Sequence, residues 1–409
     1  MFNKETDYSN QDLVNLLYYL DDNYSDFTVL HSNYQTSYSG DKTVLAFGLV
    51  KELSSLSALS HRVRAKNQFK LFGYFTYEAF NKASNNQINL LKFQEYKNHI
   101  IIDHKNNKLN FVLENDSIFN QINNHKAKPN HNKTQICSSH SSNMTDEDFK
   151  SYVTEIKKDI SYGEYYQLNL TRKFFGKTAK NTDKIGIFLN LTQEFPAPYS
   201  ALIRHQDKYI ISSSPERFIK IENNKIQSRP IKGTLAKTKS SNKELLYNSI
   251  KDRAENLMII DLMRNDLSPS SILGSVKTGK LFEIDEFANL YHMSTNVMSK
   301  KLDNISNIEV IKNAFPPASM TGAPKKAVTD RILEIEKLPR GVYSGAIGYF
   351  TDQEYCDFNV VIRTIIFDKD SYEYQVGGGI TYDSDPELEL QETNIKSAKI
   401  RKVLGISDN

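Results

Sequence analysis

The sequence is short of several features that mark common classes of protein. It has only two cysteines, Cys137 and Cys356. Two are too few for a disulfide framework and favour reduced thiols in a cytoplasmic protein. No run of about 18 apolar residues occurs, so no membrane-spanning helix and no membrane partner are predicted. The polar segment from Met1 to Asn10 lacks the apolar centre of a secretion signal.

A strong excess of charge is also absent. The chain has 52 basic and 49 acidic side chains and a formal net charge of +3, which gives no reason to propose nucleic acid as a partner. The glycine-rich fingerprints of dinucleotide and ATP sites are missing as well. What is present is 39% hydrophobic and 25% charged residues over 409 positions, enough for a sizeable core in one large or two fused domains.

The pattern of apolar and polar residues changes along the chain. Residues 1–120 hold short apolar runs separated by polar turns, which are typical of strands. Residues 121–144 are almost all polar and are interpreted as a surface connector. The sequence therefore predicts an N-terminal region over 1–144, ending in that connector, and a catalytic region over 145–409.

Regular elements become predictable after Thr145. Capping residues and apolar spacing predict helices, and alternating or β-branched runs predict strands. The helices are expected at 149–160, 244–263, 325–335 and 385–403, and the strands at 166–175, 209–213, 218–222 and 357–367. Strands and helices alternate irregularly, which favours an α+β fold, a mostly antiparallel sandwich.

Acidic residues stand out on two of these helices. Glu255 adjoins an apolar run, and a buried carboxylate is costly unless it is paired or bound to a metal. Glu389, Glu392 and Lys396 share one helix face. That face is either an exposed ion-pair ladder, which the segment alone favours, or a site for a hard cation and an anion.

Three further segments suggest anion binding or nucleophilic chemistry. Gly377, Gly378 and Gly379 form either a turn or bulge or a nest of backbone N–H groups. The segment 321–325 opens a helix, whose N-terminus favours anions. Lys232 stands between Ile231 and Gly233; alone it is a surface lysine, but partial burial would lower its pKa toward nucleophilic use.

Taken in order, these segments resemble chorismate-utilising enzymes. The resemblance covers about 145–403 and is closest to the aminodeoxychorismate synthase component I branch, with anthranilate synthase component I and the isochorismate and salicylate synthases as other branches. It rests on 166–170 (YQLNL), 214–218 (SPERF), 229–234 (RPIKGT), 252–258 (DRAENLM), 261–267 (DLMRNDL), 321–325 (TGAPK), 345–349 (GAIGY), 362–364 (IRT), 377–380 (GGGI) and 391–393 (QET).

The resemblance implies a large sandwich of two mainly antiparallel sheets with outer helices and an active-site cleft in the C-terminal region. It also implies Mg²⁺, held by Glu255 and Glu392 with help from Glu389. Such enzymes act on chorismate, and this branch adds ammonia to give 4-amino-4-deoxychorismate for 4-aminobenzoate and folate biosynthesis.

Two positions separate the branches. Isochorismate and salicylate synthases have a lysine where this chain has Gln167. A neutral amide cannot activate water as a base, so water addition is not expected. Anthranilate synthases have alanine where this chain has Lys232. An amine there is expected to occupy C2 of the ring, so that ammonia enters at C4.

Roles for individual residues follow from the resemblance. Lys232 is expected to attack C2, and Glu216 to act as general acid on the C4 hydroxyl, provided its pKa is raised; the alternative for Glu216 is a salt bridge with Arg217. His292 is either near the reacting ring or a packed core residue. The substrate contacts are expected from Gln167, His292, Thr321, Tyr349, Arg363, Gly377, Gly378, Gly379 and Lys396.

The sequence also bears on the partner subunit and on alternative functions. No segment resembles a glutaminase, so ammonia is expected from a separate glutamine amidotransferase subunit. The alternatives are anthranilate synthase component I and a non-catalytic chorismate-binding protein. One departure from the family is the pair Pro317-Ala318, where many relatives have two glycines, which puts the geometry of that loop in doubt.

Overall fold

The computed structural model describes residues 1–34, 36, 39–64, 70–80, 90–127, 137–179, 181–238, 241–287, 290–351 and 354–406. The helices of these residues are α1(Asn10–Asn23), α2(Leu56–Arg64), α3(Asp116–Asn124), α4(Asp146–Ser161), α5(Lys184–Glu194), α6(Lys243–Tyr247), α7(Ile250–Leu267), α8(Asn307–Ala314), α9(Lys325–Glu336) and α10(Pro386–Leu404), with short 3₁₀ turns η1(Ser268–Ser270) and η2(Ala318–Met320).

The strands of the same residues are β1(Phe2–Asp7), β2(Asp26–His31), β3(Lys42–Leu53), β4(Leu71–Phe75), β5(Leu91–Asp103), β6(Lys108–Leu113), β7(Cys137–Ser142), β8(Gln167–Thr178), β9(Tyr199–His205), β10(Lys208–Ser214), β11(Arg217–Glu222), β12(Lys225–Arg229), β13(Ile231–Ala236), β14(Lys277–Thr278), β15(Glu283–Glu286), β16(Leu290–Ser294), β17(Val297–Lys300), β18(Gly322–Ala323), β19(Ala346–Phe350), β20(Tyr355–Asn359), β21(Thr364–Asp368) and β22(Ser371–Ile380).

Most of these strands join one antiparallel network with two limbs. The first limb runs β3–β2–β9–β10–β21–β22–β8. The second runs β5–β4–β19–β20–β11–β12–β17. The long strands β3 and β5 pair with each other and connect the limbs, with a bulge between Leu49 and Lys51. Bulges bend strands, so one network supplies both layers of a sandwich.

Apolar side chains fill the space between the two limbs. Ala201, Ile203 and Ile210 of the first limb share a buried cluster with Tyr74 and Ile347 of the second. Fully burying an isoleucine side chain contributes about 1.5–3 kcal/mol, so this shared core holds the layers together. The predicted α+β architecture, a mainly antiparallel sandwich, is confirmed.

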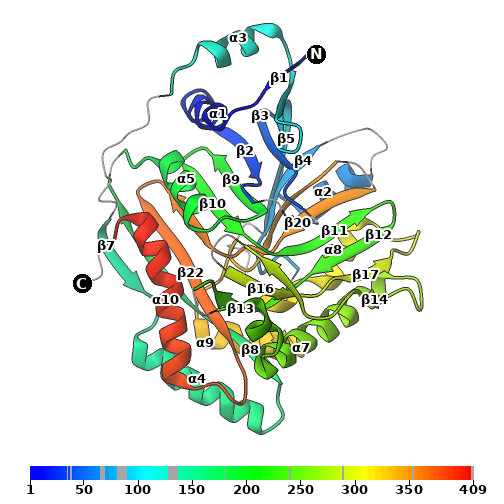
Figure 1. The fold of residues 1–409 in the computed structure, drawn as a ribbon, viewed down its shortest axis with the longest axis vertical. Helices are drawn as coiled ribbons and strands as arrows, with labels where there is room; N and C mark the ends of the chain where they lie inside the picture. The colour runs from blue at the N-terminus through cyan, green and yellow to red at the C-terminus, as the bar shows by residue number, and fades with distance from the viewer. Residues whose placement is uncertain are drawn as a thin grey trace.

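Helices cover the outer faces of both limbs (Figure 1). Helices α4, α9 and α10 share a buried apolar cluster with β8 and the end of β22. Helices α7 and α8 pack against β11, β12 and β17 through a second cluster. Helix α10 lies along β22 (Figure 1).

Two predicted elements are divided in the structure. The helix expected at 244–263 is split into α6 and α7, because Ser249 takes an extended conformation and caps α7 by accepting from Asp252 N. The strand expected at 357–367 is split into β20 and β21. Between them, Arg363 has a positive φ of 53°, which interrupts the extended backbone.

Strands from before residue 145 pair with strands from after it. Strand β2 pairs with β9, β4 with β19, and β7 with β8. The expected connector at 121–144 contains the end of α3 and the whole of β7, so it is not a plain surface loop. Within the described residues, no helix combines the length and apolarity needed to cross a membrane.

Candidate active site

A cavity of about 560 Å³ opens at one end of the sandwich. Its walls come from β13 and β16, from β22, from α7 and α10, and from the loops before β11, before β18 and before β21. Nine of the predicted catalytic, metal and anion-binding positions, together with His292 and Lys396, line it. These residues are Glu216, Lys232, Glu255, His292, Arg363, Gly377, Gly378, Gly379, Glu389, Glu392 and Lys396.

Strand β13 delivers Lys232 to the cavity. The next residue, Gly233, has φ +91°, and a Cβ there would lie 2.9 Å from the Cβ of Asp252 on α7, so only glycine lets β13 approach that helix. Among the described residues, no hydrogen bond or ion pair fixes the Lys232 Nζ. Burial lowers the pKa of Lys232, partly opposed by the nearby carboxylate of Glu255. The amine is therefore partly activated as a free base.

Glu216 occupies the turn between β10 and β11 and is 4% exposed. Burial raises its pKa to about 7, while Ser319, Lys232 and Arg363 favour the charged form. The alternative of a salt bridge with Arg217 is wrong, because the Arg217 guanidinium donates to both oxygens of Asp357 at 3.0 Å. Glu216 therefore faces the cavity with an ionisable proton near neutral pH.

Arg363 and His292 form a pair beside Glu216. The Arg363 Nη2 lies 3.3 Å from His292 Nε2, and the other ring nitrogen lies 2.8 Å from Thr234 Oγ1. Since a guanidinium only donates, Nε2 accepts and the imidazole is neutral. Burial lowers the pKa of His292 to about 3 and that of Arg363 to about 10. The interruption between β20 and β21 is what turns Arg363 into the cavity.

The three glycines lie inside β22, so the expectation of a nest, turn or bulge is wrong. They pair in regular register with Thr171, Leu170 and Asn169 of β8. The N–H groups of Thr171 and Asn169 donate to Glu336 and Thr321 instead of to β22. In an antiparallel pair this leaves the N–H groups of Gly377 and Gly379 pointing away from β8. Strand β21 pairs only as far as Tyr374, so that edge of β22 borders the cavity.

A Cβ at any of these three positions would meet neighbouring atoms, and on Gly377 it would collide with the backbone oxygen of Leu170. A Cβ on Gly378 would lie 3.2 Å from Glu389 Oε2 and 3.9 Å from Glu392 Oε1. A Cβ on Gly379 would collide with the amide nitrogen of Gln167 and would lie 3.2 Å from Lys232 Nζ. Gln167 itself is 1% exposed and lies behind Gly379, next to the lysine amine.

The predicted metal ligands reach the cavity from two helices. Burial raises the pKa values of Glu255 on α7 and Glu389 on α10. The Glu389 Oε1 accepts from Ser384 at 2.7 Å. Lys396 pairs with Glu392 at 2.7 Å, lowering the pKa of Glu392, and donates to Gly377 O. The expected ion-pair ladder on α10 is therefore limited to Glu392 and Lys396. Glu255 and Glu389 remain as partly desolvated carboxylates.

The donor set fits a hard divalent cation. Carboxylate oxygens are the ligands that Mg²⁺ prefers, usually one or two of them with water, and desolvated carboxylates gain from a nearby cation. Their oxygens are not all within 4.8 Å of one another; the group of described residues that meets that spacing is Asp26, Glu52 and His205. Glu255, Glu389 and Glu392 would therefore hold an ion partly through water.

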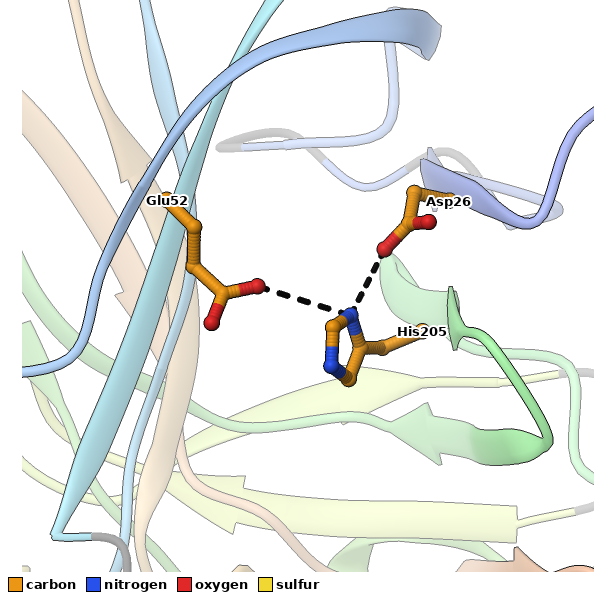
Figure 2. A group of neighbouring side chains, drawn as sticks. All are labelled: Asp26, Glu52 and His205. Atoms are coloured by element: carbon orange, nitrogen blue, oxygen red, sulfur yellow. Dashed lines mark hydrogen bonds and ion pairs between the residues drawn. The ribbon is translucent and has the colours of Figure 1, made fainter.

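Figure 2 shows that the closer group is a salt-bridge cluster. Both carboxylates approach the same imidazole nitrogen, His205 Nδ1, at 2.6 Å from Asp26 and 3.5 Å from Glu52. Lys92 pairs with the other oxygen of Glu52 at 3.1 Å, and Gln94 donates to Asp26. Each group already has a partner, so the cluster joins β2, β3 and β9 structurally.

Three predicted substrate contacts, Gln167, Tyr349 and Thr321, are not among the residues that line the cavity. Tyr349 donates to the hydroxyl of Tyr355 and stacks on Phe72, because its strand β19 is in the second limb. Thr321 is fully buried, and its hydroxyl donates to Pro317 O. At the start of the helix after it, Lys325 pairs with Asp266 at 2.6 Å. The structure therefore does not support contacts from these residues.

Sequence reasoning missed several residues that line the cavity, including Asn169, Ser319, Lys251 and Lys399. It also missed Arg340, which is 1% exposed and binds Glu336 through two nitrogens. Asn169 stands two residues after Gln167, so the alternation of β8 gave a usable signal for it. Ser319 and Arg340 had none, because their places depend on long-range folding.

Comparisons with known proteins show the family of the chain. A family model described as chorismate binding enzyme matches residues 16–402. Aminodeoxychorismate synthase component 1 of Escherichia coli strain K12 is 35% identical over 312 residues, which are 75% of this chain and 68% of that protein. Anthranilate synthase component 1 of Saccharolobus solfataricus is 31% identical over 263 residues, which are 63% of this chain and 62% of that protein.

Solved structures share the fold. The crystal structure of anthranilate synthase component I from Streptococcus pneumoniae superimposes with a TM-score of 0.77 at 23% identity, covering 91% of this chain and 94% of that one. The family match spans nearly the whole chain, and it agrees with the sandwich and with the cavity that the predicted residues share. The chain belongs to the chorismate binding enzyme family.

Proposed function

We propose that this protein converts chorismate and ammonia to 4-amino-4-deoxychorismate, as component I of an aminodeoxychorismate synthase. The observation that carries the proposal is the pair formed by Glu216 and Lys232. Both line one cavity, and burial shifts their pKa values toward each other, Glu216 to about 7 and Lys232 downward. Burial thus favours the neutral forms of both groups, a protonated acid and a free amine, which are the forms that an acid-assisted nucleophilic substitution needs.

The proposed reaction has two substitutions. The Lys232 amine forms a bond to ring carbon C2, the ring double bonds C1=C2 and C5=C6 shift to C1=C6 and C4=C5, and the C4–oxygen bond breaks as Glu216 protonates the leaving hydroxyl to water. Ammonia then bonds to C4, the two double bonds return to C5=C6 and C1=C2, and the C2–nitrogen bond to Lys232 breaks. The excess proton of the new amine passes to the Glu216 carboxylate, so the enzyme ends unchanged and the enolpyruvyl group stays on.

Cationic groups of this chain are positioned for the substrate carboxylates. Arg363 lies beside Glu216 and His292, and the open N–H groups of Gly377 and Gly379 border the same cavity. Glu255, Glu389 and Glu392 would hold Mg²⁺ on the α7 and α10 side. When bound, Mg²⁺ supplies Lewis-acid polarisation of a substrate carboxylate. His292, neutral and hydrogen-bonded to Thr234, orients Arg363.

The partner and the setting are part of the proposal. Relatives carry the name component 1, which supports a second component, a glutamine amidotransferase that supplies ammonia, and a place in cytoplasmic 4-aminobenzoate and folate biosynthesis. Anthranilate synthase component 1 is also related. Lys232 favours amination at C4 over the anthranilate reaction, because its side chain takes the approach to C2.

Product analysis tests the proposal. Purified protein is incubated with chorismate, Mg²⁺ and ammonium, and the products are identified by mass spectrometry and fluorescence. The expected product is 4-amino-4-deoxychorismate, which keeps the three enolpyruvyl carbons and is not aromatic. Anthranilate or isochorismate as the main product would contradict the branch, and absence of turnover would favour a non-catalytic chorismate-binding protein.

A further inference from the structure

Three polar side chains beside the catalytic pair are buried and have unused hydrogen-bonding capacity. Among the described residues, Gln167 Oε1 and Asn169 Nδ2 have no hydrogen bond, and Ser319 Oγ has no partner besides the neighbouring carboxyl of Glu216, although the three side chains are only 1%, 3% and 5% exposed. Buried polar atoms in folded proteins nearly always have a partner, so unpaired ones need an explanation. Because the three atoms lie at one site, a ligand that binds there is the simplest explanation.

Two of these residues line the cavity directly, Asn169 from β8 and Ser319 from η2. The two segments are fixed side by side. Asn169 N donates to Thr321 O at 2.8 Å, and the buried Arg340 donates to Asn169 O at 2.7 Å and to Met320 O at 2.6 Å. Because the backbone groups of Asn169 are used in these bonds, only its carboxamide is left to face the cavity.

Charge and free hydrogen-bonding capacity separate these two groups from the rest of the site. Most other polar walls are charged, including Arg363, Lys396 and the carboxylates of α7 and α10. The other neutral polar side chains, Thr234, His292 and Gln375, are hydrogen-bonded to protein groups. Those groups suit the carboxylates of the substrate and a metal ion. Asn169 and Ser319 are neutral, and Ser319 lies close enough to Glu216 to influence its pKa. They therefore border the place where a hydroxyl is expected to leave.

We propose that Asn169 and Ser319 form the subsite that holds the incoming ammonia next to Glu216. Ammonia has one lone pair and three N–H donors. The Asn169 amide and the Ser319 hydroxyl provide the matching donors and acceptors, since an amide offers both and a hydroxyl donates and accepts. The same groups hydrogen-bond the water molecule that leaves before ammonia enters. The inference rests on the proposed function, because it names where the second substrate of that reaction binds.

The test separates the two substrates kinetically. Steady-state rates are measured at fixed pH with chorismate, Mg²⁺ and ammonium for the wild type, Ser319→Ala and Asn169→Leu. Loss of one hydrogen bond to ammonia raises its KM about tenfold, while the KM for chorismate stays within about twofold. High ammonium then restores kcat to near the wild-type value, which a distorted scaffold would not allow.

A matched control is Ser271→Ala. Ser271 is a buried serine whose hydroxyl donates to Leu267 O and Ser299 Oγ, outside the residues that line the cavity. It is expected to lose some stability and to keep the wild-type KM for ammonia. Circular dichroism shows whether Asn169→Leu is folded; if it is not, the smaller change in Ser319→Ala decides the question alone.

The outcomes distinguish the subsite from the proposed function. If the wild type forms no amino product, the proposed function fails. If the wild type is active but the variants keep its KM for ammonia, or raise both KM values in parallel, the subsite is wrong and the function stands. A rise confined to the KM for ammonia, rescued at high ammonium, supports both.

Discussion

At the scale of single residues, the proposed function rests on Glu216 and Lys232, whose pKa values the fold shifts away from their usual ranges. Glu216 and Lys232 have opposite charges, and a direct ion pair would have fixed both in their charged forms. Instead Arg217 pairs with Asp357, and among the described residues the Lys232 amine forms no direct ion pair with the carboxylates near it. Burial then dominates, raising the pKa of the acid and lowering that of the amine.

The pH dependence of kcat/KM follows from Glu216. A general acid must be protonated, and the protonated fraction of a group with a pKa of about 7 falls as the pH rises through 7. We expect the rate to fall above that pH. In Glu216→Gln the rate drops by about 10²–10⁴-fold, and the remaining activity no longer falls as the pH rises through 7. A wild-type profile flat from pH 6 to 9 would contradict the assignment.

At the scale of elements, breaks in strands and helices and close packing of the backbone position the residues of the site. The break between β20 and β21 turns Arg363 inward, and the break between α6 and α7 starts the helix that presents Glu255. Strand β22 passes between Lys232 and the carboxylates of α10 because it has glycines there. Periodicity predicted these elements as continuous, since a single positive φ or a capping serine leaves the apolar pattern unchanged.

Adding a methyl group to β22 tests how closely this strand packs against Gln167 and Lys232. In Gly379→Ala the new Cβ collides with the Gln167 amide and lies 3.2 Å from Lys232 Nζ. Overpacking of this kind costs about 1–3 kcal/mol of stability, and we expect kcat to fall at least about tenfold because the amine is displaced. Steady-state kinetics and thermal unfolding measure the two effects.

Gly279→Ala is the matched control for that variant. A Cβ there meets only ordinary contacts, 3.4 Å from Asn296 Cβ, and Gly279 does not line the cavity. It is expected to keep wild-type kinetics. Equal kinetics for both variants would show that β22 does not constrain the lysine.

A buried ion pair joins α7 to α9. Lys325 Nζ lies 2.6 Å from Asp266, and both side chains are at most 14% exposed. Removing one partner leaves a buried charge, so Asp266→Ala is expected to lower the free energy of unfolding by about 3–5 kcal/mol. Urea denaturation measures the loss. The double variant Asp266→Leu with Lys325→Met is expected to recover most of it, and a loss under about 1 kcal/mol in the single variant would contradict a stabilising role for the pair.

At the scale of the whole molecule, the sequence predicted the fold class and eleven of the residues that line the cavity. It succeeded where short segments carry specific residue types, as in 229–234 and 389–396. Tyr349 and Thr321 do not line the cavity, and their hydroxyls bond to Tyr355 and Pro317. No local pattern reveals which face of a packed strand looks into a cavity; that depends on pairings such as β19 with β4.

The account depends on the Lys232 amine reaching ring carbon C2. Intact-protein mass spectrometry, with enzyme and chorismate mixed without ammonia, tests this most directly. We expect an adduct of the mass of chorismate less one water, located by proteolysis on the peptide containing Lys232, absent in Lys232→Ala and discharged by ammonium. An active enzyme that forms no such adduct, or forms it on another residue, would contradict the account.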